Sequence, residues 1–293
     1  LAKTEADFIS ILKAVSNPDD QVTSRLAQYC EAVGRAEEAS QYLEQVASAR
    51  PTAEIFSRLF TNYLRKESPC IRVFLDQDPP ATAEGLFAEE KLKSRLPFLL
   101  GLRKSFEQLP EHQGVRYMFL AMEAEKGKAQ ATSEATRKRF HEEMVVSYTK
   151  SLEALDAKRL KAPLVVLNNL AWYLSEDPDP GRKARGLELA RRGKDQMPSI
   201  ADAPDAQDTY AWALYQNGKL VEAEQALRDL VRTVDEPTYR YHLARVLFDM
   251  KKLDEALVEV RRARDFTRPF ADDLAAHELE IEIKEARRKA VGE

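Results

Sequence analysis

One five-residue pattern recurs four times in this chain of 293 residues and constrains its fold more than any other feature. The pattern is a large apolar residue, Ala, two variable residues and a second apolar residue. It occurs at Leu26–Cys30, Leu170–Leu174, Tyr210–Leu214 and Leu243–Leu247. Its first and last residues are one helical turn apart and share one face of a helix, and the Ala leaves room for a neighbouring helix. The pattern therefore predicts helices that pack closely against other helices.

A turn and a second amphipathic segment follow each copy of the pattern. Three of these second segments open with the same dipeptide, at Glu38-Ala39, Glu222-Ala223 and Glu255-Ala256, and the last two copies are 33 residues apart. Prolines at 51, 198, 237 and 269 mark where the second segments end, because proline cannot continue a helix. Gly34 and Gly218 fall in the turns, where a left-handed residue can end the first helix. The sequence thus predicts repeated helix–turn–helix units.

These units resemble a known family. The stretches Ser24–Pro51, Asp208–Pro237 and Thr238–Pro269 are similar to tetratricopeptide repeats, which are helix–turn–helix units of about 34 residues. Leu164–Pro198 resembles one with a longer turn, and Gly186 stands where the others have Ala. Met250-Lys251 replaces the turn glycine of the last unit. The resemblance implies an all-α, right-handed α-solenoid. Asn168–Trp172 and Thr209–Trp212 also resemble repeats in bacterial envelope and exopolysaccharide-assembly proteins.

We expect four segments along the chain. They are N-terminal repeats over 1–80, a divergent helical segment over 81–161, three C-terminal repeats over 162–269 and a capping helix over 270–293. The divergent segment is predicted to contain helices at about 82–95, 97–109, 111–128 and 133–158. Thr4–Val15 reads as the second helix of a repeat whose first helix is missing, so we expect a fragment of a longer repeat protein.

Composition argues against several other classes of protein. The net charge is −4 and there is no basic excess, so no nucleic-acid partner is expected. The densest basic run, from Arg182 to Lys194, is interpreted as a solvated helix face. No apolar run reaches the length of a membrane span. The compartment stays open, since both the bacterial cytoplasm and the periplasm agree with these features.

Motifs for catalysis or metal binding are missing from the sequence. There is no glycine-rich phosphate loop, nucleophile elbow or Cys-x-x-Cys pair. His141 and His277 each begin a pattern like that of a zinc-protease helix, but Val145 and Ile281 stand where the second His is required. Cys30 and Cys70 are interpreted as apolar core residues. We therefore expect no catalytic residue, no metal and no cofactor.

The family resemblance implies instead a concave groove, lined by the first helices of successive repeats, that receives a peptide or protein partner. The helix face that avoids the apolar pattern supplies the candidate residues. They are Asn168, Asn169, Trp172, Asp208, Thr209, Trp212, Tyr215, Tyr241, His242, Arg245 and Asp249. Trp172 and Trp212 each follow the pattern's Ala. Two interpretations stay open: the rings bind an extended peptide, or they pack between adjacent repeats.

Chaperone adaptors of this family grip a partner's C-terminal carboxylates with lysine, asparagine and arginine side chains. Those places hold Asn168, Trp172, Thr209, Thr238 and His242, with no Lys or Arg among them, so chaperone tails are not expected partners. The sequence predicts a non-catalytic scaffold for protein–protein interaction. The alternative is a regulatory or substrate-docking arm of an enzyme whose catalytic domain lies outside these residues.

Overall fold

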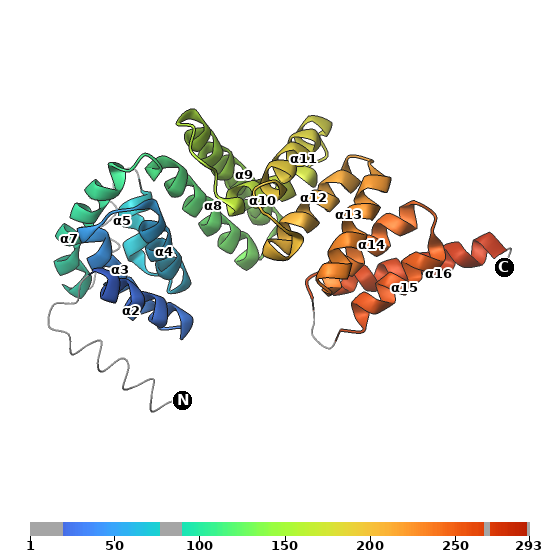
Figure 1. Ribbon diagram of the computed structural model, residues 1–293, viewed down its shortest axis with the longest axis horizontal. Helices are drawn as coiled ribbons and strands as arrows, with labels where there is room; N and C mark the ends of the chain where they lie inside the picture. The colour runs from blue at the N-terminus through green and yellow to red at the C-terminus, as the bar shows by residue number, and fades with distance from the viewer. Residues whose placement is uncertain (1–19, 77–89, 267–269, 292–293) are drawn as a thin grey trace, which may run out of the picture. The chain divides into compact units, whose positions relative to one another are not determined.

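The computed structural model describes residues 20–76, 90–266 and 270–291 (Figure 1). All regular structure in these ranges is helical, which confirms the all-α prediction. The chain divides into two compact units, Leu1–Lys161 and Ala162–Glu293. The helix predicted at Thr4–Val15 lies outside the described residues. None of the described helices is long and apolar enough to cross a membrane.

Unit 1 (Leu1–Lys161) begins its described part with helix pairs. Its elements are α2 (Asp20–Ala32), α3 (Ala36–Ala49), α4 (Ala53–Arg65), η1 (Pro69–Ile71), α5 (Arg72–Leu75), α7 (Glu90–Glu107), α8 (His112–Gln130) and α9 (Glu134–Ala157). The strongest contacts join α2 with α3 and α8 with α9. Helices predicted at 111–128 and 133–158 therefore occur as α8 and α9, within two residues at each end.

One helix of unit 1 differs from the prediction. Separate helices were expected at 82–95 and 97–109, but α7 runs without a break from Glu90 to Glu107 and contains Pro97. Proline removes one helical hydrogen bond. Pro97 is exposed, so water can solvate the freed carbonyl, whereas Leu99, Leu102 and Phe106 of the same helix are buried. The packing of those three side chains holds the helix continuous through the proline.

An aromatic cluster forms the core of unit 1. It contains Phe56, Phe60, Phe74, Phe106 and Phe119, each at most 1% exposed. Ring centroids within the cluster lie 4.9 to 6.3 Å apart, with tilted or edge-to-face geometry. These rings come from α4, α5, α7 and α8, so residues far apart in sequence share one core.

Unit 2 (Ala162–Glu293) contains the repeated helix pairs. Its elements are α10 (Leu164–Ser175), α11 (Pro180–Lys194), η2 (Ile200–Asp202), α12 (Pro204–Gln216), α13 (Leu220–Thr233), α14 (Pro237–Asp249), α15 (Leu253–Arg264) and α16 (Asp273–Val291). The even-numbered helices contact one another in order, and each odd-numbered helix packs on the helices before and after it. A single pair cannot bury its own apolar face, so neighbouring pairs bury it together.

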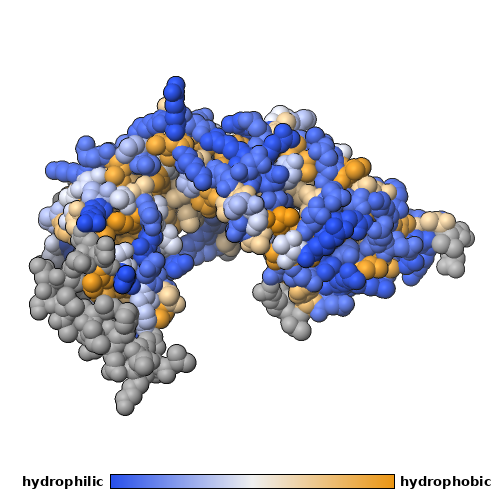
Figure 2. Space-filling view, in the orientation of Figure 1, coloured by the Kyte–Doolittle hydropathy of each residue, from blue (hydrophilic) through white to orange (hydrophobic). Residues whose placement is uncertain are grey.

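Alanines of the five-residue pattern and of the Glu-Ala dipeptides lie at these helix contacts. Ala171, Ala211, Ala223, Ala244 and Ala256 are all 0% exposed. Gly34 and Gly218 have φ of 78° and 74°, which confirms their left-handed turns. Lys251 takes the same conformation, with φ of 64°, in the unit that has no turn glycine. Hydrophilic side chains cover most of the visible surface, with apolar patches between them (Figure 2).

Candidate functional site

Five aromatic rings from α10, α12 and α14 come together on one face of unit 2. Trp172 stacks on Trp212 with ring centroids 6.1 Å apart, and Trp212 stacks on His242 at 4.3 Å. Tyr215 lies 4.7 Å from Trp212, and Tyr241 lies 5.5 Å from His242. We name these five residues the aromatic face. Because first helices of successive repeats adjoin, residues in equivalent places form a continuous row.

The two tryptophans have different environments. Trp212 is only 8% exposed, and its indole N–H donates to the carboxylate of Glu176 at the end of α10. Trp172 remains partly exposed although it occupies the equivalent place in its repeat. Trp212 therefore has the geometry of a packing residue between repeats, while Trp172 keeps part of its surface exposed.

Three polar pairs link α12 to α14 beside these rings. Tyr239 donates its hydroxyl proton to Asp205 at 2.6 Å, and Tyr215 donates to Asp249 at 2.7 Å. His242 Nδ1 and Asp208 Oδ1 are hydrogen-bonded at 2.8 Å, and both side chains are buried. The partners in every pair are 34 residues apart. We name these three pairs the polar ladder. Four of the candidate residues, Asp208, His242, Tyr215 and Asp249, have their hydrogen-bond partners within it. The near-repeat spacing of its partners is the signal that could have predicted it.

Three carboxylates from different segments of unit 2 act on His242: Asp208 on α12, Glu176 just after α10 and Asp272 just before α16. Burial lowers the pKa of His242, but the negative charges of Asp208, Asp272 and Glu176 outweigh burial, so the pKa is raised above its ordinary value. Burial raises the pKa of Asp272, and the charges of Asp208 and Glu176 raise it further, against an opposing effect of His242. The sequence analysis included Asp208 but missed Glu176 and Asp272, which lie near the ends of helices outside the repeated pattern.

The remaining candidates lie around the rings or beneath them. Asn168 Nδ2 donates to Asn169 Oδ1 at 3.4 Å, and Asn168 Oδ1 is buried with no donor among the described residues. Arg245 contacts the Tyr215 hydroxyl at 3.3 Å and the carboxylate of Asp249 at 3.7 Å. Thr209 is buried. The accessible candidates are Asn168, Asn169, Trp172, Tyr215, Tyr241, Arg245 and Asp249.

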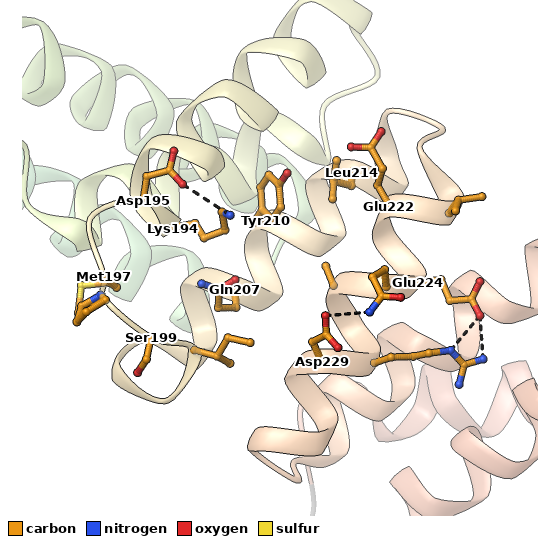
Figure 3. A pocket seen from close by; sticks show the side chains of 16 residues that line it. Lys194, Asp195, Met197, Ser199, Gln207, Tyr210, Leu214, Glu222, Glu224 and Asp229 are labelled. Carbon is orange, nitrogen blue, oxygen red and sulfur yellow. Dashed lines mark hydrogen bonds and ion pairs between the residues drawn. The ribbon is translucent and has the colours of Figure 1, made fainter.

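A separate cavity of about 950 Å³ lies on the other side of α12 (Figure 3). Tyr210 and Gln207 of α12 line it, together with the outer side of α13 and the linker at Met197–Ile200. The first residues of α10 and α12 are 40 residues apart, against 33 for α12 and α14. The longer linker lines this cavity. The unequal spacing of the repeats is therefore the feature of the sequence that could have predicted the cavity. Lys194 lies 4.9 Å above the Tyr210 ring there.

Other residues noted in the sequence have ordinary structural surroundings. Arg182 pairs with Asp177 at 2.7 Å, and Arg185 pairs with Glu188 at 2.6 Å, on the exposed side of α11. Cys30 and Cys70 are buried and form no disulfide. Within the described ranges, no group of three His, Cys, Asp or Glu side chains is placed to hold a metal ion.

A match to a family model supports the repeat assignment for part of unit 2. Residues 194–263 match the family model described as anaphase-promoting complex, cyclosome, subunit 3. Among solved structures, the chain resembles a thermophilic TPR protein of Thermus thermophilus, with 17% identity and a TM-score of 0.29 over 90% of this chain and 98% of that one. It also resembles the TPR domain of P58(IPK), with 12% identity and a TM-score of 0.37 over 94% of this chain and 100% of that one.

No curated protein matches the sequence. Proteins built from such repeats are in general scaffolds for protein–protein interaction and are typically non-catalytic. The helix pairs of unit 2, at 33-residue spacing from α12 onward, and the family model that matches residues 194–263 show that this part of the chain is built from helical repeats similar to tetratricopeptide repeats.

Proposed function

We propose that the aromatic face of unit 2 binds an extended segment of a protein partner, and that the chain acts as an interaction scaffold. The observation that carries the proposal is the partly exposed Trp172 ring, stacked at 6.1 Å on the buried ring of Trp212. Large, rigid aromatic rings supply much of the binding energy in protein interfaces. Since Trp212 is itself held by Glu176 and His242, the platform is formed before a partner binds.

Polar side chains on the same face suit the backbone of an extended segment. Asn169 and Asn168 precede Trp172 by about one turn of α10, while Arg245 and Asp249 lie on α14. Their amide, guanidinium and carboxylate groups can bond peptide N–H and C=O groups. An apolar platform with polar groups at its edge is the usual division of roles in protein interfaces.

We also propose that the chain has no catalytic role. The buried acid–base pair at the aromatic face, His242 and Asp208, has no nucleophilic side chain hydrogen-bonded to it among the described residues. Nucleophilic catalysis requires such a group within hydrogen-bond reach of the base. The pair is better explained by its place in the polar ladder between α12 and α14.

The chain's two tryptophans, Trp172 and Trp212, allow a direct test, since both belong to the aromatic face. Peptides are selected from a random library on the full chain and titrated while tryptophan emission is recorded. We expect saturable changes in emission. Trp172→Ala, measured with labelled peptide, should weaken binding by about 2 kcal/mol, or roughly 30-fold.

The control variant is Val221→Ser, because Val221 on α13 is 71% exposed and lies away from the aromatic face. It should bind selected peptides as the wild type does. Circular dichroism and thermal unfolding should show that Trp172→Ala folds normally. Equal peptide affinities for Trp172→Ala and the wild type would disprove the proposed site.

A further inference from the structure

We propose that the partner segment is basic, and that a Lys or Arg side chain is received between the Trp172 ring and the carboxylates of Glu176, Asp208 and Asp272. This inference rests on the proposed function, and it specifies the chemistry of the ligand for the same face. The argument combines hydrogen-bond capacity, net charge and ring chemistry at that face.

Hydrogen-bond capacity is the first element. Glu176 is exposed and accepts bonds from the indole N–H of Trp212 and, at 3.1 Å, from Gln216 Nε2. A carboxylate has about four lone-pair sites, so acceptor capacity remains. The partly buried carboxylate of Asp272 has no hydrogen-bond or ion-pair partner among the described residues. Asp272 therefore lacks a donor among the described residues, and Glu176 can accept further hydrogen bonds, which an ammonium or guanidinium group can supply.

The balance of charge points the same way. Glu176, Asp208, Asp249, Asp272 and Glu282 place five carboxylates around the aromatic face. The cationic groups near the face include Arg245, the titratable His242 and Lys183, which lies 3.4 Å from the side-chain amide oxygen of Gln216. Arg245 already contacts Tyr215, Asp249 and Glu282, and His242 is buried against Asp208. The face is thus net negative, which attracts a basic segment and repels an acidic one.

Repulsion within the carboxylate group supports this reading. The pKa of Asp272 is raised by burial and by the charges of Asp208 and Glu176, despite the opposing effect of His242. The positive charge of His242 therefore does not fully offset burial and the neighbouring carboxylates at Asp272. A bound cation would offset these effects further.

The rings supply the remaining attraction. Cations bind over the face of an aromatic ring, and tryptophan is the strongest of the natural rings for this contact. Arg stacks its planar guanidinium on such rings while its N–H groups reach carboxylates in the same plane. Trp172 is on α10, which contains no charged residue, so no cation from its own helix competes for the ring. The neighbouring Glu176 carboxylate lies one turn further along the chain.

The test is the sequence composition of the selected peptides. A random library is panned on the full chain at low salt. Enriched peptides should carry a net positive charge with a recurring Lys or Arg, and raising the salt should weaken their binding, since ionic attraction is screened. Replacing the recurring Arg by citrulline, which keeps the shape and removes the charge, should lower affinity by about tenfold or more.

Variants that replace a carboxylate by an amide of the same size test which carboxylates of the protein attract the basic peptide. The double variant Glu176→Gln with Asp272→Asn keeps side-chain size and should weaken binding of the Arg peptide by about tenfold, while hardly changing the citrulline peptide. Glu222→Gln removes a carboxylate of α13, away from the aromatic face, and should change neither. Circular dichroism checks that each variant folds.

The outcomes separate the two proposals. Enriched peptides that are neutral or acidic, yet depend on Trp172, would overturn the basic ligand and leave the binding site intact. Equal loss of the Arg and citrulline peptides in the double variant would also overturn it. If no peptide is enriched, or if binding ignores Trp172→Ala, both the proposed function and this inference are wrong.

Discussion

At the scale of single residues, His242 connects the packing of the aromatic face to its electrostatics. Its ring stacks on Trp212 at 4.3 Å, and its Nδ1 is hydrogen-bonded to Asp208 at 2.8 Å. A buried imidazole ordinarily loses its proton, because burial disfavours the charged form. Here the carboxylates of Asp208, Asp272 and Glu176 outweigh burial and raise the pKa. The protonation of one residue thus depends on carboxylates from three other segments of unit 2.

We predict that the His242 imidazole titrates above the ordinary value of about 6.5. A group whose pKa is raised on folding stabilises the fold below its unfolded pKa, and this contribution is lost as pH rises through the folded pKa. NMR titration of the imidazole signals measures the midpoint, and His242→Gln assigns the resonance. Asp208→Asn keeps a hydrogen-bonding group without the charge and should lower the midpoint. A wild-type midpoint below the ordinary value would contradict the role given to the carboxylates.

At the scale of helices, Gly186 shows how closely α11 approaches α10. A Cβ at Gly186 would lie 2.7 Å from Ser175 Oγ and 2.9 Å from the backbone oxygen of Ala171. Backbone atoms cannot move aside as flexible side chains do. The glycine that departs from the repeat pattern, where other units have Ala, is therefore required by a close helix contact.

We predict opposite results for two glycines of α11. Gly186→Ala should lower the free energy of unfolding by about 1–3 kcal/mol through overpacking. At Gly193 the nearest atom would be 3.4 Å from the new Cβ, an ordinary contact. Gly193→Ala should therefore be neutral or stabilise by up to about 1 kcal/mol through helix propensity. Urea unfolding followed by tryptophan emission measures both, because both tryptophans lie in unit 2. Equal effects of the two substitutions would count against the close contact.

At the scale of the whole molecule, each unit builds its core from its own residues. Unit 1 has the cluster of five phenylalanines, whereas unit 2 has stacked layers of Leu and Ala from successive helix pairs. In repeat proteins, stability is approximately the sum of each repeat and its contacts with its neighbours. We therefore expect unit 2 to be stabilised mainly by interactions among its own residues.

We predict that residues 162–293 fold when produced alone. Their tryptophan-detected unfolding midpoint should match that of the full chain, since the same residues surround both indoles. In the full chain, circular dichroism reports both units and tryptophan emission reports unit 2 only, so the two unfolding curves should not coincide. An isolated segment without helical structure would show that unit 2 depends on unit 1.

The sequence by itself determined the features that depend on local periodicity. The helix pairs, the buried alanines and the left-handed turns at Gly34 and Gly218 follow from spacing along one helix or one turn. The helix through Pro97 was mispredicted because the packing of α7 into a core of distant aromatic residues outweighs a local preference.

Only the tertiary structure decided which candidate residues are buried between helices and which remain exposed to solvent. Trp172 and Trp212 are equivalent in sequence, but within unit 2 the helix α12 contacts both α10 and α14, whereas α10 contacts only α11 and α12 strongly. Trp212 is therefore covered by neighbours on both sides, and Trp172 stays partly exposed. The carboxylates of Glu176 and Asp272 reach His242 only because successive repeats stack. Burial and charge depend on neighbours distant in sequence, and a repeat pattern does not specify them.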